Sequence, residues 1–228
     1  MLHFPTIFLN LYIIIWKDFL IEIRNQSIVL RMMMFSLTLL VIMQYVIPNH
    51  VNFRSEITPG ILWINFIFMG ILGINRITSI EMSNSCYEGM LLTPISRTIY
   101  YFGKVLSGLI FIVLAELIIT LFYTLLFNVN LINALFFLIC LLGSLGYMFL
   151  GTLLSMMCIN AHNQEMLLSL LLFPLLLPLV IPCVKATAAL LSTPFIWGEY
   201  QMWLSLIIAY DVIMISSFYL LVSFIERT

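Results

Sequence analysis

The stretch KVLSGLIFIVLAELIITLFYTLLF, residues 104–127, decides the fold of this protein. After its opening lysine, Glu116 is its one charged residue. A helix of about 20 consecutive apolar residues is long enough to cross the hydrocarbon core of a bilayer. The stretch therefore predicts a transmembrane helix that carries a single carboxyl group inside the membrane.

The composition of the whole chain agrees with a lipid environment. Hydrophobic residues make up 63% of its 228 residues and charged residues 8%, whereas a soluble domain carries about 25% charged residues. The net charge of −1 creates no overall field that would attract nucleic acid. We expect an all-α integral membrane protein that contacts membrane lipid and binds no nucleic acid.

The hydropathy pattern predicts a single transmembrane domain over residues 1–228, built as a six-transmembrane-helix bundle. The expected spans are about 28–47, 59–80, 104–127, 134–159, 166–184 and 201–225. The first 27 residues need a separate explanation. Residues 5–27 show apolar residues at helical spacing but also contain Lys17, Asp18, Glu22 and Arg24. Each charge would cost roughly 3 kcal/mol at the membrane centre, so we expect an amphipathic interfacial helix.

The basic residues predict how the bundle is oriented. Cytoplasmic ends of membrane proteins carry more Lys and Arg than the opposite ends. One side of the expected spans receives Lys17, Arg24, Arg31, Arg76, Arg97, Lys104 and Arg227, and the other receives Arg54 and Lys185. We therefore expect both termini on the cytoplasmic side, or on the matrix side in an organelle.

The connection at 81–103 is the longest one on that side, and its length favours a function. It contains Glu81, Glu88, Gly89, Met90, Leu92 and Pro94. Pro94 disfavours helix at the residue before it, so a short amphipathic helix that ends near Thr93 is one interpretation. Such a helix would offer apolar and acidic side chains to a soluble partner. An ordinary solvated loop is the other interpretation.

Two carboxyls, Glu116 and Asp211, are expected inside spans, where an unpaired ionised group is costly. They either line a passage or helix contact, or form a hydrogen bond to a neighbouring helix. The fifth span carries Pro174, Pro178 and Pro182. Each removes a backbone donor, which predicts either a hinge or a static bend.

Motifs for catalysis and for phosphate binding are missing from the sequence. It contains no GxxxxGK[ST], HExxH or GxSxG pattern, and its three histidines (His3, His50 and His162) are far apart. We expect no catalytic residues, no metal site and no directly bound cofactor.

Several of these features occur in an order that resembles the CcmB family, haem exporter protein B of cytochrome c maturation. They are Thr58-Pro59-Gly60-Ile61-Leu62-Trp63, then Arg76, Glu81, Glu88, Met90, Leu92, Pro94 and Lys104, and the proline-containing run FPLLLPLVIP at 173–182. The sequence departs from the family pattern at Asn75, Ser85 and Gly103.

The resemblance implies an ABC-2 type membrane subunit that pairs with a separate ATPase, CcmA, through the 81–94 segment. It also implies CcmC and CcmD as membrane partners and the haem chaperone CcmE as the protein served, with ATP hydrolysis driving release of haem-loaded CcmE. ATP and haem would then be bound by partners. The expected location is the inner membrane of a bacterium or a mitochondrion.

Three alternatives remain open at this stage. The chain could be an ABC-2 exporter permease for another substrate, a membrane assembly scaffold without an ATPase, or an intramembrane enzyme. The last is the weakest because no nucleophile or metal-ligand cluster accompanies Glu116 or Asp211.

Overall fold

A computed structural model describes residues 3–25, 27–47, 51–83, 96–158, 163–192, 195 and 197–227. Within these residues the chain forms seven helices. They are α1 (His3–Asn25), α2 (Ser27–Val46), α3 (Val51–Ser83), α5 (Arg97–Phe127), α6 (Ala134–Cys158), α7 (Gln164–Leu191) and α8 (Trp197–Arg227).

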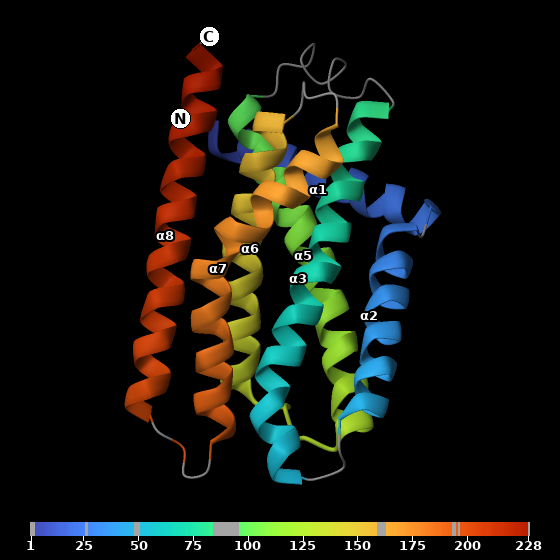
Figure 1. The fold of residues 1–228 in the computed structure, drawn as a ribbon. Helices are drawn as coiled ribbons and strands as arrows, with labels where there is room; N and C mark the ends of the chain where they lie inside the picture. Colours follow the sequence, from blue (N-terminus) through green and yellow to red (C-terminus); the bar gives the residue numbers. More distant parts are fainter. Residues whose placement is uncertain are drawn as a thin grey trace.

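Six of the seven helices, all except α1, are long and apolar enough to cross a membrane. They lie side by side in an up-and-down bundle (Figure 1). The prediction of an all-α membrane bundle is confirmed. Figure 1 also places α1, the end of α3, the start of α5 and the C-terminal end of α8 at the same end of the bundle.

Helices α3 and α6 form the centre of the bundle. Their apolar windows bury 67% and 61% of their residues, whereas the window of α2 buries 17%. Glycines allow the central helices to approach closely. A Cβ atom at Gly70 would lie 2.7 Å from the Tyr147 ring, and one at Gly151 would lie 2.1 Å from Ile74. Both contacts join α3 to α6, so small residues set the spacing of the two central helices.

Three helix boundaries lie about two turns from the expected spans. Helix α3 begins at Val51, before Pro59, and its early turns are held by the Tyr123 hydroxyl, which donates to Thr58 Oγ1 at 3.0 Å. Helix α5 begins at Arg97 because Ser96 caps it and accepts the Ile99 amide at 3.3 Å.

Helix α7 continues to Leu191, past the expected end of the fifth span at residue 184. Lys185 is exposed at the surface of the helix, whereas Ala186, Thr187 and Ala189 are buried. The helix can therefore continue for about two more turns with one face in the core.

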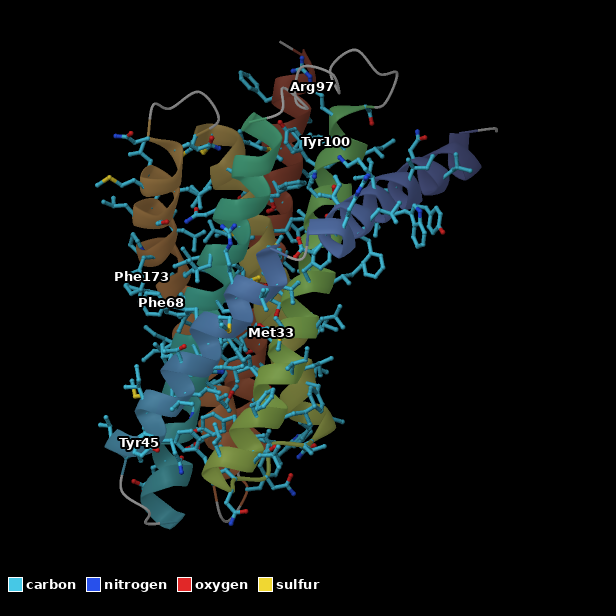
Figure 2. All side chains as sticks on the ribbon, turned by 90° about the vertical axis from the view of Figure 1, so that its right-hand side faces the viewer. Met33, Tyr45, Phe68, Arg97, Tyr100 and Phe173 are labelled. Carbon is cyan, nitrogen blue, oxygen red and sulfur yellow. The ribbon has the colours of Figure 1, made fainter. Side chains whose placement is uncertain are left out.

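Helix α1 projects sideways from the bundle (Figure 2). It packs on α5 and touches the start of α2. The sequence predicts an amphipathic interfacial helix here, and the structure adds partners within the protein for two of its carboxylates. Asp18 is an ion-pair partner of Lys104 on α5, and Glu22 is 5% exposed. These two carboxylates therefore lie against the bundle and are shielded from water.

Candidate functional site: a polar cluster around helix α6

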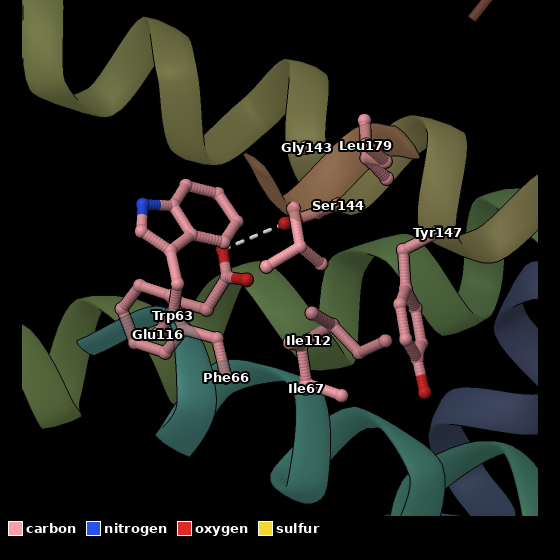
Figure 3. Close-up of a pocket in the computed structure, with 10 residues that line it drawn as sticks. Trp63, Phe66, Ile67, Ile112, Glu116, Gly143, Ser144, Tyr147 and Leu179 are labelled. Atoms are coloured by element: carbon pink, nitrogen blue, oxygen red, sulfur yellow. Dashed lines mark hydrogen bonds between the residues drawn. The ribbon is translucent and has the colours of Figure 1, made fainter. Parts of the chain in front are cut away.

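The polar cluster in the core starts with Glu116 on α5 and Ser144 on α6. Glu116 is 4% exposed, and the Ser144 hydroxyl lies 2.7 Å from its Oε2 atom (Figure 3). Ser144 Oγ also lies 2.7 Å from the carbonyl oxygen of Cys140. One hydroxyl carries only one proton. A protonated Glu116 that donates to Ser144, while Ser144 donates to Cys140, satisfies both contacts together.

A small cavity adjoins this pair. Its volume is about 20 Å³, enough for one water molecule. Residues of α3, α5, α6 and α7 line it: Trp63, Phe66, Ile67, Ile112, Glu116, Gly143, Ser144, Tyr147, Leu179 and Val180. Figure 3 shows Glu116 and Ser144 on one side of this space and the Tyr147 hydroxyl pointing away from them. The cavity can therefore hydrate the carboxyl group but cannot hold a molecule the size of haem.

Trp63 ties this cluster to α7. Its indole N–H donates to Thr187 Oγ1 at 3.0 Å, and the Thr187 hydroxyl lies 2.8 Å from the carbonyl of Cys183. A Cβ atom at Gly143 would lie 2.5 Å from the Trp63 ring and 3.3 Å from Cys183 Sγ. Gly143 thus gives the indole ring and the thiol the space to meet on the surface of α6.

Asp211 approaches α6 from the other side, on α8. Its side chain is 4% exposed, and a Cβ atom at Gly146 would lie 2.2 Å from its Oδ1 atom. Neither carboxyl oxygen of Asp211 has a hydrogen-bond partner among the residues that the structure describes. Gly146 makes room for this carboxyl, one turn along α6 from the position where Gly143 faces Trp63.

The proline-rich part of α7 is bent (Figure 1). A proline has no amide N–H and its ring disturbs the preceding turn. The Tyr210 hydroxyl of α8 donates to the Leu175 carbonyl at 3.0 Å, three residues before Pro178. The carbonyl that Pro178 leaves without a backbone donor is that of Pro174, so the Tyr210 hydroxyl bonds the next carbonyl within the same disturbed turn.

The structure brings only some of the predicted site residues together. Glu116 and Asp211 both face α6, on successive stretches of its small-residue surface. Pro174, Pro178 and Pro182 lie inside α7, next to this cluster. Four further members of the cluster were not predicted from the sequence: Trp63, Ser144, Thr187 and Tyr210. Small and polar residues within the apolar α6 sequence were the available signal.

The predicted contact residues at the end of the bundle are mostly outside the described residues. Glu81 lies in the last turn of α3, and only its backbone is described. Glu88, Gly89, Met90, Leu92 and Pro94 lie outside the described residues. The flanking helices end and begin at Ser83 and Arg97, at the same end of the bundle as the C-terminal end of α8.

The described residues contain no group of three or more His, Cys, Asp or Glu side chains that could hold a metal ion. The architecture defines a class: a multi-pass α-helical membrane protein with an amphipathic end helix and a closed polar core.

The family model of the CcmB protein matches residues 9–224, so the chain belongs to the CcmB family. No curated protein matches the chain. CcmB proteins are membrane transporter subunits for haem export in cytochrome c maturation, and they are not catalytic enzymes.

Proposed function

We propose that this chain is the membrane subunit that couples a separate, CcmA-like ATPase to cytochrome c maturation. The family match over residues 9–224 carries this proposal. The 81–94 segment contacts the ATPase, and ATP hydrolysis drives release of a haem-loaded, CcmE-like chaperone. CcmC-like and CcmD-like membrane proteins complete the complex in an ABC-2 type arrangement.

The length of α3 supports a contact outside the membrane. The helix has 33 residues, which corresponds to about 50 Å, whereas the hydrocarbon core is about 30 Å thick. Its apolar window ends at Asn75. The remaining turns, through Ser83, extend past that window toward the 84–95 segment. A partner in the aqueous phase can therefore reach this end of α3.

The ends of the bundle differ in charge, which supports the cytoplasmic or matrix side for the ATPase contact. Seven basic residues (Lys17, Arg24, Arg31, Arg76, Arg97, Lys104 and Arg227) belong to helices or helix ends at the end of the bundle where α1 lies. Arg54 and Lys185 lie toward the other end. By the positive-inside rule, both termini face the cytoplasm or matrix. The family match supports the inner membrane as the location.

The small core cavity favours chaperone release over passage of haem through this single chain. Its volume of about 20 Å³ is enough for one water molecule, and the Glu116 and Trp63 side chains beside it are bonded to neighbouring helices. We therefore place haem on the partner subunits.

The decisive variant combines Glu88→Lys with Pro94→Ala. We expect it to insert normally but to lose ATPase association and most assembly of c-type cytochromes, because charge and helix termination change together at the contact. Glu199→Lys is the matched control, since this exposed acid lies at the first turn of α8, at the opposite end of the bundle.

Copurification of the ATPase and haem staining of c-type cytochromes are the two readouts. A double variant that kept both would show that the 81–94 segment is not the contact. Purification of the wild-type chain separates the alternatives. An ATPase alone would indicate an exporter permease for another substrate, and no ATPase at all would indicate a scaffold.

A further inference from the structure

Helix α1 turns the face that carries its two carboxylates toward the protein. Ile14, Asp18 and Glu22 follow one another at intervals of four residues, so they share one face of the helix. Ile14 is 2% exposed, the Asp18 side chain is 10% exposed and Glu22 is 5% exposed. This face lies on α5 and on the start of α2.

An ion pair lies at the centre of the α1–α5 contact. Lys104 Nζ lies 2.9 Å from Asp18 Oδ1, and the Ser107 hydroxyl donates to Asp18 Oδ2 at 2.8 Å. Both carboxylate oxygens therefore have a partner on α5. The Lys104 side chain is 7% exposed, so little water screens the pair.

Apolar contacts flank the ion pair on both sides. A Cβ atom at Gly103 would lie 3.1 Å from Ile14 Cβ, and the rings of Phe19 and Phe111 are stacked with centroids 6.3 Å apart. Farther along α1, Glu22 Oε1 accepts the amide of Val29 at 2.9 Å and so caps the first turn of α2. Together these contacts fix α1 in position and in rotation about its axis.

The opposite face of α1 is apolar and aromatic. Leu9, Tyr12, Trp16 and Leu20 repeat at helical spacing and are 48–63% exposed. Tyr and Trp are enriched where membrane meets water. Because the carboxylates point inward and this stripe points outward, the boundary between lipid headgroups and acyl chains is the environment that suits α1.

We propose that Asp18, Lys104 and Ser107 form a latch that joins α1, which lies at the membrane surface, to the first turns of α5 as one rigid body. Lys104 is seven residues from the start of α5, about 10 Å along the helix. The latch thus fixes the height of Arg97, where the chain returns from the 84–95 segment, relative to the lipid surface. The role of the latch in coupling rests on the proposed function. The existence of the latch does not depend on that function.

A charge exchange tests the ion pair. We expect Asp18→Lys alone and Lys104→Asp alone to lower assembly of c-type cytochromes several-fold and to loosen α1, because each leaves like charges facing each other. The combined exchange should restore most of the assembly, since an opposite pair forms again. Lys17→Met is the control, because Lys17 is 40% exposed and its ion pair with Asp18, at 3.4 Å, joins two residues of α1 itself.

A disulfide tests the rigid body directly. Bridged cysteines have Cβ atoms about 3.8 Å apart, so Ile14→Cys with Gly103→Cys needs only a small opening of the contact. We expect efficient oxidation in the wild-type background and less after Asp18→Asn. The cross-linked chain should retain cytochrome assembly, because α1 need not leave α5.

Two results would overturn the proposal. One is a combined charge exchange that is no better than the single changes. The other is a cross-linked chain that loses activity and regains it on reduction, which would mean that α1 must separate from α5. Cross-linking yield is independent of any partner. If no ATPase copurified with the wild-type chain, that result would count against the proposed function. The latch could still be tested by the cross-linking yield.

Discussion

At the scale of single residues, the core of this protein depends on pairing polar groups with small ones. Ser144 faces the Glu116 carboxyl, and the glycines nearby on α6 leave room for the Trp63 ring and the Asp211 carboxyl. A buried polar group without a partner costs about 1–3 kcal/mol. Each polar side chain of this cluster therefore lies where a neighbouring helix provides either a hydrogen-bond partner or a glycine that leaves room for it.

The hydrogen-bond count at Ser144 leads to a prediction for Glu116. We expect Glu116→Gln to be nearly neutral in thermal unfolding in detergent, because an amide N–H can donate to Ser144 as a protonated carboxyl does. Glu116→Ala should lower stability by about 1–3 kcal/mol, through a lost hydrogen bond and an added void. If the glutamine variant were as unstable as the alanine variant, an ionised Glu116 would be the form that the fold needs.

At the scale of elements, α7 departs visibly from a straight rod (Figure 1). Three prolines interrupt it, and contacts on both sides of Pro178 attach it to α3. Asn75 Nδ2 lies 2.8 Å from Ser169 Oγ, before the prolines, and Trp63 is bonded to Thr187 after them. A movement of α3 would therefore act on α7 both before and after its prolines.

Replacing Pro178 distinguishes a hinge from a static bend. Pro178→Ala restores a backbone donor for the Pro174 carbonyl, and an interior proline costs about 3 kcal/mol in a helix. We expect a straighter and more stable α7 but several-fold less cytochrome assembly, with normal insertion into the membrane. Leu177→Ala is the matched control, because Leu177 is an exposed neighbour. Assembly equal to that of the control would identify the bend as passive.

At the scale of the whole molecule, the two ends of the bundle are chemically different. One end gathers α1, the ion pair between α1 and α5, and most of the basic residues. At the other end, Trp197 and Tyr200 are stacked with centroids 5.6 Å apart at the start of α8. The difference in charge gives the bundle its expected orientation.

Cysteine labelling in intact cells tests this orientation. In a chain without its native cysteines, we expect Glu88→Cys to react with an impermeant maleimide only after the membrane is opened. Glu199→Cys should react from outside without opening. Equal reactivity of the two positions from one side would contradict the orientation and remove the basis for an ATPase contact at 81–94.

The sequence determined that this is a membrane bundle, because uninterrupted apolar length and scarce charge leave lipid as the only suitable solvent. It also indicated the family through ordered motifs such as Thr58–Trp63 and the prolines of α7. These features are local, so they can be read without knowing which helices are neighbours.

Only the tertiary structure decided where the polar groups go. Asp18 and Lys104 are 86 positions apart in the chain, and Trp63 and Thr187 are 124 apart, so hydropathy alone could not pair them. The sequence predicted an amphipathic interfacial helix over 5–27, but it could not show that two of its carboxylates are paired with the bundle. The reason is physical: a buried charge is stable only beside its partner, and the packing of helices determines which partner is near.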